Sequence, residues 1–500
     1  MSEPAVLAID QGTTSSRALV VSLDGRVLGS GQHPFPQEYP RPGWVEHDPE
    51  EIWRSTERAI RDALAAAGMR PQDVAAVGIT NQRETLVLWE RESGRPLGRA
   101  IVWQDRRTAP ICAELRERGL EPLFRRRTGL TIDPYFTGTK LTWVFREHPE
   151  LMARARRGEI AAGTVDAWLV WRLTGGRAHV TDYTNACRTL LFDIAEGRWD
   201  EELCDALEVP IAILPEVRPS IGPVGETDPG VFGAAVPIAG IAGDQQAAAF
   251  GQGCFSLGRA KNTYGTGAFL LAFAGHEPFE PPAGLLLSLG ARSRPGQPEY
   301  LLEGSIFVAG AVVQWLRDEL RIIERSEDIE ALAASVPDTG GVVFVPAFTG
   351  LGAPHWDPHA RGLLIGLTRG TTSAHIARAA LEAIALSSWE LLELFDTVLP
   401  EPVRVLRVDG GAARNDLLMQ LQADLAGVTV ERPTNIETTA MGAAMLAAIG
   451  AGLLPGPEEV ERRWQLDRRF EPRGEEAYRR AVRSRWREAV RRSQGWASIE

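Results

Sequence analysis

Apolar and polar stretches alternate at the start of the chain in a pattern that predicts a β-hairpin. Two apolar runs, Val6–Ile9 and Ala18–Val21, flank a polar stretch over residues 10–17, as two strands joined by a turn would. The turn signal Asp24-Gly25 then leads into a third predicted strand, Val27 to Gln32. The chain therefore begins with three strands, and its first hairpin is buried on at least one face.

A helix is predicted next, because Asp48, Pro49 and Glu51 have the character of an N-cap, an N1 proline and an N3 acid. Apolar residues then recur with helical spacing as far as Gly68, and Val74–Ile79 has the character of a buried strand. Strands, a helix and a further strand in this order indicate an α/β layer fold.

The same order of elements starts again in the second half of the chain. From Ala260 a strand leads into a Gly/Thr turn, and the apolar run Ala268–Phe273 leaves it, which suggests a duplicated core. We therefore expect two domains, residues 1–250 and residues 251–500, with a short charged helix within residues 456–500. Four apolar residues recur every four positions in that helix: Tyr478, Val482, Trp486 and Val490.

Composition limits the possible partners. The chain has 500 residues, 44% hydrophobic and 24% charged, which is typical of a globular protein of two to four domains. Its net charge of −12 argues against nucleic acid or an anionic membrane as the main partner. No apolar segment precedes the first strand and no run reaches membrane-spanning length, so a cytoplasmic location is expected. The four cysteines lie far apart and indicate neither a disulfide framework nor a metal site.

The polar turn of the first hairpin has the chemistry of a phosphate site. Asp10 stands at a strand end, where a carboxylate can face a metal ion, and Gly12 lets the backbone approach a ligand closely. Three hydroxyls and one guanidinium follow, from Thr13, Thr14, Ser15 and Arg17. Such a turn suits a Mg²⁺-bound polyphosphate. A hairpin turn that only satisfies its own backbone is the alternative, and the turn alone does not decide between them.

Polar residues also follow the strand at Val74–Ile79, and open α/β sheets bind ligands at such strand ends. Arg83 and Glu84 would point to opposite faces of an extended strand, so they converge only if the strand has ended in a turn. A guanidinium fork beside a carboxylate could then clamp vicinal hydroxyls, with Trp103 as an aromatic wall. The alternative is a surface ion pair of little energetic value.

A second strand end, after Pro237–Gly243, carries Asp244 at the start of an Ala-rich helix. Helix capping alone would explain an acid at this position. Asp244 is nevertheless a candidate general base, because a carboxylate can orient a hydroxyl and accept its proton. Upstream, residues 181–185 are predicted as a polar loop.

Two turns of the second half could hold a nucleotide. A helix predicted over Phe307–Leu320 sets Gly310 and Gln314 one turn apart on the same face. Farther along, an apolar strand ends in Gly410-Gly411 and Asn415 opens the next helix. A glycine pair at a strand–helix turn lets a flat base or sugar approach the backbone, although a plain tight turn is an equal alternative.

Lysine is rare enough in this chain to be informative. Only Lys140 and Lys261 are lysines among the 54 basic residues, so each hints that a compact ammonium is needed at its position. Thr139 and Ala260 precede them, which excludes a Gly-Lys-[Ser/Thr] phosphate loop. No G-x-G-x-x-G follows a strand either, so a nucleotide would bind by another architecture.

Taken in this order, the motifs resemble those of the FGGY carbohydrate kinases along nearly the whole chain. Two long family signatures match, the first at Tyr135, Lys140, Trp143 and Glu147, the second at Gly362–Leu367, His375-Ile376 and Ala379–Glu382. Within the family the resemblance is to the members that phosphorylate glycerol, on the segments Asn81–Glu84, Gly243–Gln246 and Phe348–Pro354. Pentulose kinases of the family tend to carry Met-His where Arg83-Glu84 stand here.

The resemblance implies an α/β protein of two actin/hexokinase-like (ribonuclease H-like) domains with ATP and a polyol in the cleft between them. It implies ATP-dependent phosphorylation of glycerol to sn-glycerol 3-phosphate, with Mg²⁺ and with domain closure that excludes water. Glycerol would be bound by Arg83, Glu84, Trp103, Tyr135, Asp244, Gln245 and Phe269. The nucleotide would be bound by Thr13, Thr14, Ser15, Arg17, Thr266, Gly310, Gln314, Gly411 and Asn415. Asp10 would face the Mg²⁺ shell, Asp244 would be the catalytic base, and a homodimer or homotetramer is expected.

Two alternatives stay open, a kinase of another polyol or ketose and, more remotely, a non-metabolic actin-like ATPase. One departure from the family concerns regulation. Members that respond to fructose 1,6-bisphosphate carry a basic, Gly-flanked loop, whereas Thr227–Pro237 has no Lys, Arg or His. We therefore expect no control by bisphosphate or by histidine phosphorylation at this loop.

Overall fold

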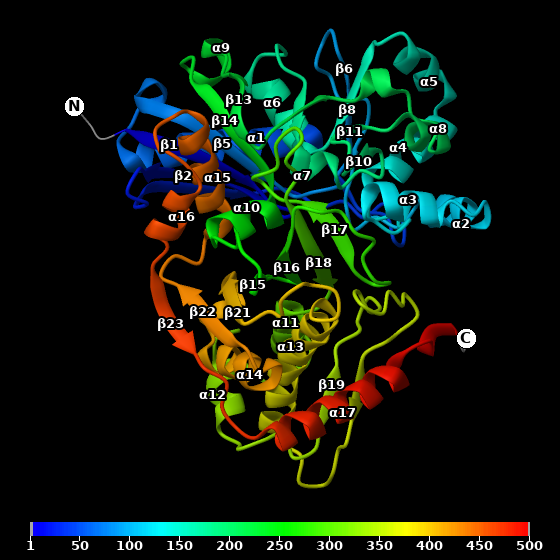
Figure 1. Cartoon of the computed structure of the whole chain (residues 1–500), viewed down its shortest axis with the longest axis vertical. Helices are drawn as coiled ribbons and strands as arrows, with labels where there is room; N and C mark the ends of the chain where they lie inside the picture. The colour runs from blue at the N-terminus through cyan, green and yellow to red at the C-terminus, as the bar shows by residue number, and fades with distance from the viewer. Residues whose placement is uncertain (1–3, 499–500) are drawn as a thin grey trace.

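The computed structural model describes residues 4–498, which form two mixed β-sheets with helices packed around them (Figure 1). The first sheet has the strand order β13-β14-β5-β1-β2-β3. Its strands are β1 (Ala5–Gln11), β2 (Ser15–Ser22), β3 (Val27–Pro34), β5 (Val74–Asn81), β13 (Ile221–Glu226) and β14 (Pro237–Gly243). The opening hairpin and the strands predicted over 27–32, 74–79 and 237–243 are all confirmed.

The second sheet has the order β17-β18-β16-β15-β21-β22-β23. Its strands are β15 (Arg259–Tyr264), β16 (Ala268–Gly275), β17 (Leu286–Leu289), β18 (Tyr300–Ile306), β21 (Val405–Asp409), β22 (Thr429–Pro433) and β23 (Leu466–Phe470). Together the two sheets span most of the chain, and the boundary predicted near residue 250 falls between β14 and β15.

The two sheets repeat one topology. In the first, β1 pairs antiparallel with β2 and parallel with β5, β5 pairs parallel with β14, and β13 runs antiparallel to β14. In the second, β15 pairs antiparallel with β16 and parallel with β21, β21 pairs parallel with β22, and β23 runs antiparallel to β22. The predicted duplication of the core is therefore confirmed, with β17 as an extra edge strand.

Helix α1 (Pro49–Ala67) covers β2 and β3 and has the predicted ends. The Asp48 carboxylate accepts a hydrogen bond from the Glu50 N–H at 2.8 Å, and Gly68 ends the helix with a φ of 65°. On β3, Gly31 lies so close to the helix that a Cβ there would clash with the Ala59 carbonyl. The contact between helix and sheet therefore requires glycine on the strand.

Helix α15 (Thr438–Gly450) belongs to the second half of the chain but packs on β1, β5 and β14 of the first sheet. Close approach is possible because the facing residues are small: a Cβ on Gly240 would lie 2.5 Å from the Ala447 nitrogen. The two halves of the chain thus interlock, which the sequence pattern does not predict.

A long insertion, residues 82–220, separates β5 from β13. Its helices are α2 (Ala109–Glu117), α3 (Glu121–Thr128), α4 (Thr137–Glu147), α5 (Pro149–Arg156), α6 (Val165–Leu173), α7 (Tyr183–Ala186) and α8 (Glu201–Ala206). Its short strands are β6 (Val87–Glu90), β7 (Ala100–Ile101), β8 (Ile160–Gly163), β9 (Val180–Asp182), β10 (Phe192–Asp193), β11 (Arg198–Trp199) and β12 (Glu216–Arg218). The strand β4 (Glu46–His47) precedes the insertion and pairs with β7. The loop predicted over 181–185 is wrong: these residues are the end of β9 and most of α7, and all are buried.

Most of the remaining helices surround the second sheet or join the two sheets, whereas α9 (Pro229–Phe232) connects β13 to β14 and packs against α6. The others are α10 (Asp244–Gly251), α11 (Gly310–Asp318), α12 (Asp328–Ala334), α13 (Ser373–Phe395), α14 (Asp416–Ala426), α16 (Glu458–Arg463) and α17 (Glu476–Ser493), and β19 (Val343–Val345) pairs with β20 (Leu363–Ile365).

The charged helix expected within residues 456–500 is α17, but it does not fill this range. Val482, Trp486 and Val490 are buried against the second domain's own helices and β19, whereas Tyr478 is 48% exposed. The helix α16 and the strand β23 precede it and were missed by the prediction. The missed strand lies at the sheet edge with only Phe470 buried, so its sequence lacks the apolar alternation of a strand.

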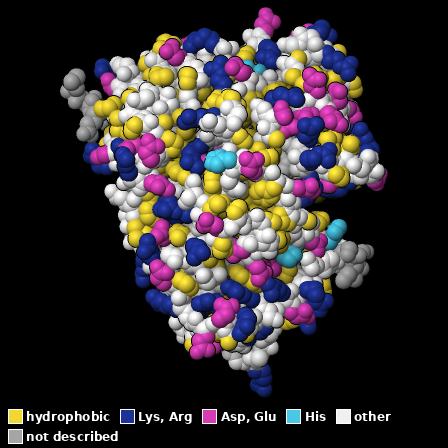
Figure 2. Space-filling view, in the orientation of Figure 1, with side chains coloured by type: hydrophobic (Ala, Val, Ile, Leu, Met, Phe, Trp, Pro, Cys, Tyr) yellow, Lys and Arg dark blue, Asp and Glu magenta, His cyan; other side chains and the backbone are white. Residues whose placement is uncertain are grey.

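Acidic and basic side chains are interspersed over the face drawn in Figure 2, without a large patch of one sign. Within residues 4–498, no helix is both long and apolar enough to span a bilayer.

Candidate active site

The strand β5 ends at Asn81, and the chain then bends sharply. Glu84 has a φ of 62°, in the left-handed region, so the condition for Arg83 and Glu84 to converge is met. The Arg83 Nε lies 3.8 Å from the Glu84 Oε1, and both side chains are 2% exposed. The alternative of an exposed surface ion pair is therefore wrong.

The neighbouring strand β14 brings Asp244 to the same place. Gly243 pairs with Asn81 in the parallel ladder, so the carboxyl ends of the two strands lie side by side. The Arg83 Nε lies 3.2 Å from the Asp244 Oδ1. Asp244 is the first residue of α10. Beside the ion pair with Arg83, the adjacent Gln245 N–H is the one described group that donates a hydrogen bond to its carboxylate, at 2.7 Å, which leaves capacity for a ligand.

Aromatic rings form one side of this cluster. The Trp103 ring meets those of Tyr135 and Phe269 edge to face, with centroid distances of 5.6 and 6.3 Å. Because Phe269 lies on β16, the second sheet contributes to the wall. The Trp103 indole N–H donates to the Thr13 hydroxyl at 2.9 Å, which links the wall to the first hairpin turn.

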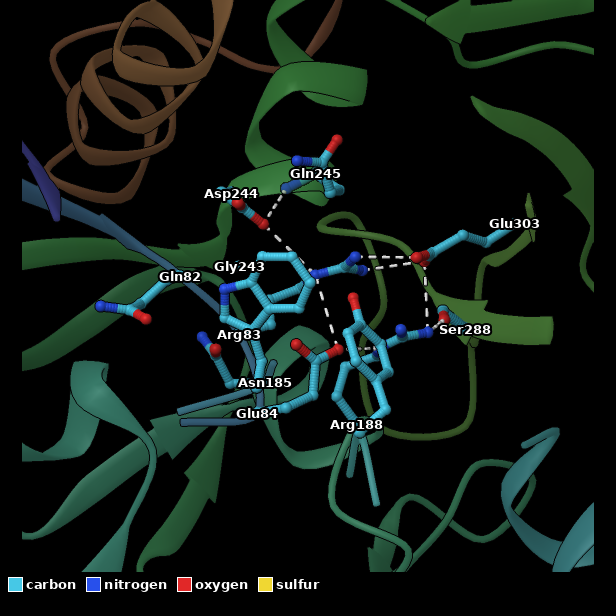
Figure 3. Close-up of polar contacts among 12 residues, drawn as sticks. Gln82, Arg83, Glu84, Asn185, Arg188, Gly243, Asp244, Gln245, Ser288 and Glu303 are labelled. Atoms are coloured by element: carbon cyan, nitrogen blue, oxygen red, sulfur yellow. Dashed lines mark hydrogen bonds and ion pairs between the residues drawn. The ribbon is translucent and has the colours of Figure 1, made fainter. Parts of the chain in front are cut away.

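The Arg83 fork has a protein partner in this structure, and its predicted contact with polyol hydroxyls stays a prediction. Both terminal nitrogens of Arg83 donate to Glu303 on β18, at 2.8 and 2.7 Å, so the fork is engaged by protein (Figure 3). Arg188 also joins the cluster: its Nε donates to the Glu84 Oε1 at 2.6 Å and its Nη1 to the Glu303 Oε2 at 3.2 Å. What remains for a ligand is the Nε edge of Arg83 and the second oxygen of Glu84.

The four charges strongly influence one another. Burial would raise the pKa of Glu303, but Arg188 and Arg83 outweigh it and lower that pKa to about 2. Burial likewise raises the pKa of Glu84, and the same two arginines only partly offset it. Burial would lower the pKa of Arg83, but Glu303 and Glu84 outweigh it and raise that pKa. Glu303, Arg83 and Arg188 therefore stay charged, and Glu84 lies against both arginines within the same buried cluster.

Arg188 and Glu303 were not singled out from the sequence, although one signal was present. Each is a charged residue inside an apolar stretch, Glu303 in Tyr300–Ile306 and Arg188 before Leu190-Leu191. A charge that is buried this way needs a partner, but the partner of Glu303 lies 220 residues away in the chain.

Both lysines are buried beside predicted site residues. The Lys140 ammonium donates to the backbone carbonyls of Glu84 and Tyr135, each at 2.9 Å. The Lys261 ammonium donates to the Gln245 side chain and, at 2.9 Å, to the Thr263 hydroxyl. Burial lowers the pKa of Lys140 to about 7 and that of Lys261 to about 8. The expectation that a compact ammonium is used at both positions agrees with these contacts.

The first hairpin turn is closed by one backbone hydrogen bond, from the Gly12 N–H to the Ser15 carbonyl at 2.9 Å. Its side chains are turned to other groups or to solvent: Ser15 accepts from Gln32 at 2.9 Å, and Thr14 is exposed. Arg17 is held by Gln32 and by an ion pair with Glu437, the residue preceding α15. The turn thus offers hydroxyls and amides, with its cation already balanced by Glu437.

The second group of predicted nucleotide residues gathers at one end of the second sheet. The Gly310 and Ala311 N–H groups donate to the carbonyls of Gly265 and Thr266, at 2.9 and 3.1 Å, which seats the start of α11 on the β15–β16 turn. Gly410 follows β21, the neighbour of β15, with a φ of 83°, and a Cβ there would lie 2.5 Å from the Tyr264 carbonyl oxygen.

The other members of that group lie near these turns. Gly411 has open space around it, and Gln314 is exposed one turn into α11. The Asn415 side-chain oxygen caps α14 by accepting from the Leu418 N–H at 2.8 Å, and its amide nitrogen stays available to a ligand.

Asp10 lies at the end of β1, and its surroundings suit a divalent cation. Burial raises its pKa to about 7, Arg17 opposes this rise, and the nearby Asp244 and Glu437 carboxylates add to it. In residues 4–498 no group of three or more His, Cys, Asp or Glu side chains could hold a metal alone. Mg²⁺ needs only one or two carboxylates when phosphate oxygens and waters complete its shell, so Asp10 fits this ion.

Sequence comparison relates this chain to known proteins. Residues 5–251 match the N-terminal domain of the FGGY family of carbohydrate kinases, and residues 260–451 match its C-terminal domain. The chain is 59% identical to a glycerol kinase of Aromatoleum aromaticum over 493 residues, 99% of each chain. It is 57% identical to a glycerol kinase of Leptothrix cholodnii, covering 98% of this chain and 99% of that one.

Solved structures agree. The Plasmodium falciparum glycerol kinase with ADP has a TM-score of 0.90 at 32% identity, with 98% of both chains covered. A ligand-bound xylulose kinase from Lactobacillus acidophilus has a TM-score of 0.86 at 23% identity, covering 99% of this chain and 97% of that one, which bears on the fold alone.

Proposed function

The chain belongs to the FGGY family of carbohydrate kinases, and we propose that it transfers the γ-phosphoryl group of ATP to glycerol, giving sn-glycerol 3-phosphate for glycerol utilisation. The observation that carries the substrate is the convergence of Arg83, Glu84 and Asp244 at two adjacent strand ends. A small polyol between them would meet acceptors on two sides and the aromatic wall on a third. The identity to glycerol kinases over nearly the full chain supports the same substrate.

The reaction needs little covalent chemistry from the protein. A hydroxyl attacks the γ-phosphorus in line, and catalysis rests on positioning and on electrostatic stabilisation of the phosphoryl oxygens. Glu84 and Arg83 orient the polyol, and Asp244 accepts the proton of the attacking hydroxyl. The amides and hydroxyls of residues 12–15 bind phosphate oxygens, and Arg17 adds positive charge.

Mg²⁺ is the expected cofactor, held by the ATP phosphates and by the water shell that Asp10 faces, where it would neutralise phosphate charge. The adenosine end of ATP would lie on the second sheet, against Thr266, Gly310, Gln314, Gly411 and Asn415. The Plasmodium falciparum glycerol kinase, whose solved structure is one with ADP, supports nucleotide binding by this fold.

We assign the polyol site and the phosphate hairpin to a domain of residues 1–250 and the nucleotide site to a domain of residues 251–500. Phe269 and α15 extend from the second domain into the first. A homodimer or homotetramer and a cytoplasmic location stay predictions, and light scattering during size-exclusion chromatography would measure the assembly.

The function is tested by ADP release against a panel of triols, tetritols and ketopentoses. The kcat/KM for glycerol should exceed that for each of the others by about 100-fold or more. A substrate of another shape leaves buried polar groups, its own or those of the site, without hydrogen-bond partners. The product should be the sn-3 phosphate in a stereospecific assay. A preference for a ketopentose or a longer polyol would favour another FGGY kinase activity, and ADP release that no acceptor stimulates would indicate an ATPase.

A further inference from the structure

Glu303 is the most unusual residue of the second sheet. It lies in the middle of β18 and is fully buried, as are the other residues of this strand. A carboxylate in such a position is strongly destabilising unless it is paired and hydrogen-bonded. Its partners are two arginines from the first half of the chain, Arg83 and Arg188 (Figure 3). Glu303 therefore joins the second sheet to the polyol site.

The geometry indicates what Arg83 would do without this partner. Its Nε already lies 3.2 Å from Asp244 and 3.8 Å from Glu84, so both carboxylates attract the same guanidinium. Arg188 repels it, because burial strengthens the repulsion between like charges. With the fork released from Glu303, Arg83 would turn onto Asp244 and Glu84 and occupy the oxygens that a polyol needs.

Arg188 fixes the position of Glu84. It binds one oxygen of Glu84 through Nε, and Glu303 and the Ser288 hydroxyl through Nη1, at 2.6, 3.2 and 2.9 Å. Its guanidinium also lies over the Tyr135 ring, 5.5 Å from the centroid. One oxygen of Glu84 is thereby fixed, and no described residue donates a hydrogen bond to the other.

We infer that Glu303 and Arg188 are positioning residues of the polyol site, which keep Asp244 and the second oxygen of Glu84 free for the hydroxyls of the acceptor. The inference rests on the proposed function. Because Glu303 and Ser288 lie on the second sheet and Glu84 and Asp244 at the ends of the first, the binding geometry depends on how the two sheets dock.

The test uses the full-length chain with Glu303→Gln, which keeps the shape of the side chain and removes its charge. The kcat/KM for glycerol should fall by roughly 100-fold, with a raised KM for glycerol and a KM for ATP within about twofold of the parent value. Glu299→Gln is the matched control. Glu299 is also buried, lies one residue before β18 and pairs with Arg292, but contacts no residue of the proposed site. Its kcat/KM for glycerol should stay within about twofold of the parent value.

Calorimetric titration with glycerol separates the inference from the proposed function. If the parent protein binds no glycerol, the proposed function fails. If the parent binds and Glu303→Gln binds equally well, the inference alone is overturned. It is also overturned if Glu303→Gln weakens ATP and glycerol binding equally, because this would indicate a general loss of structure. Thermal unfolding of both Gln variants measures that loss directly.

A double variant tests the route of the effect. If Glu303 acts by holding Arg83 away from Asp244, then Glu303→Gln should weaken glycerol binding several-fold less in an Asp244→Asn background than in the parent. An unchanged effect in that background would contradict this route. Arg188→Lys keeps the charge but loses the planar fork, so it should also raise the KM for glycerol by about tenfold or more, with an unchanged KM for ATP. Equal KM values for glycerol in Arg188→Lys and the parent would contradict the part assigned to Arg188.

Discussion

The two sheets of this protein have the same topology but different chemistry at corresponding strand ends. At the carboxyl ends of β1, β5 and β14 the first sheet presents Asp10, the Arg83-Glu84 pair and Asp244. The β15–β16 turn and the end of β21 in the second sheet present glycines, Thr266 and backbone amides. A duplicated core has thus been adapted at one set of strand ends for charge chemistry and at the other for close approach of the backbone.

This contrast indicates why the two sets respond differently to substitution. The polyol side depends on buried charges that form ion pairs with one another, so a change in one side chain alters the pairing and orientation of the others. The nucleotide side depends on backbone conformation and on open space, so it tolerates changed side chains better than an added Cβ at a constrained glycine. Four measurements can break or sharpen this distinction.

The largest effect is expected for Asp244→Asn on the charged side. The amide cannot accept the proton of the attacking hydroxyl, so kcat should fall by about 100-fold or more, with the affinity for ATP nearly unchanged. Steady-state kinetics with equilibrium nucleotide binding measure both quantities. Near-normal turnover would remove Asp244 from the role of base.

Gly410→Ala should have a smaller effect, and this effect should be on ATP rather than on the transfer to glycerol. Its φ is 83°, and the Tyr264 carbonyl oxygen would lie 2.5 Å from the new Cβ, so there is no room for a methyl group and the turn must shift. The KM for ATP should rise about tenfold, with the affinity for glycerol unchanged. Gly452→Ala is the control, because that glycine also has a positive φ, 73°, but nothing lies within 4 Å of its Cβ position. An equal rise in both variants would assign the effect to general strain rather than to the nucleotide turn.

Lys140→Met should change how stability depends on pH. The unfolded chain keeps the Lys140 proton up to a pKa of 10.5, whereas burial lowers the folded pKa to about 7 and Glu84, Asp105 and Asp133 only partly oppose this. Between these values the unfolded state binds more protons, so this lysine makes the unfolding free energy rise with pH.

The difference in unfolding free energy between the parent protein and Lys140→Met should therefore rise, by roughly 3 kcal/mol, from pH 7 to pH 10. Urea titrations at three pH values measure it. A difference that stays flat across this range would show that Lys140 keeps its proton in the folded state.

The last prediction is that fructose 1,6-bisphosphate has no effect on the rate. Residues 227–237, which include α9, have no Lys, Arg or His, so fructose 1,6-bisphosphate should leave the rate unchanged. Inhibition at micromolar concentrations would contradict this prediction and would point to a bisphosphate site elsewhere on the chain.

Local patterns predicted much of the fold. The hairpin at residues 5–22 and the capped helix α1 follow from apolar spacing and from Asp48, Pro49 and Gly68. The strand β23 could not be found this way, because an edge strand with one buried side chain has no period-2 pattern. The packing of α15 on the first sheet is a tertiary property that no local signal contains.

Only part of the site could be predicted, because local sequence patterns do not contain tertiary contacts. Residues at strand ends, such as Asp10 and Asp244, could be found from the strands that precede them. The partners that orient them could not, because the Arg83–Glu303 pair joins positions far apart in the chain. Two buried charges in apolar stretches were the available signal, and such charges are worth examining for partners in any sequence of this kind.

The most direct test of the account is a crystal structure with glycerol, Mg²⁺ and a non-hydrolysable ATP analogue. We expect glycerol against Glu84, Asp244 and the Trp103 ring, with the triphosphate running from the first hairpin turn to the Gly410-Gly411 turn. A terminal hydroxyl of glycerol should then face the γ-phosphorus. Glycerol bound elsewhere, with these strand ends unoccupied, would contradict the account.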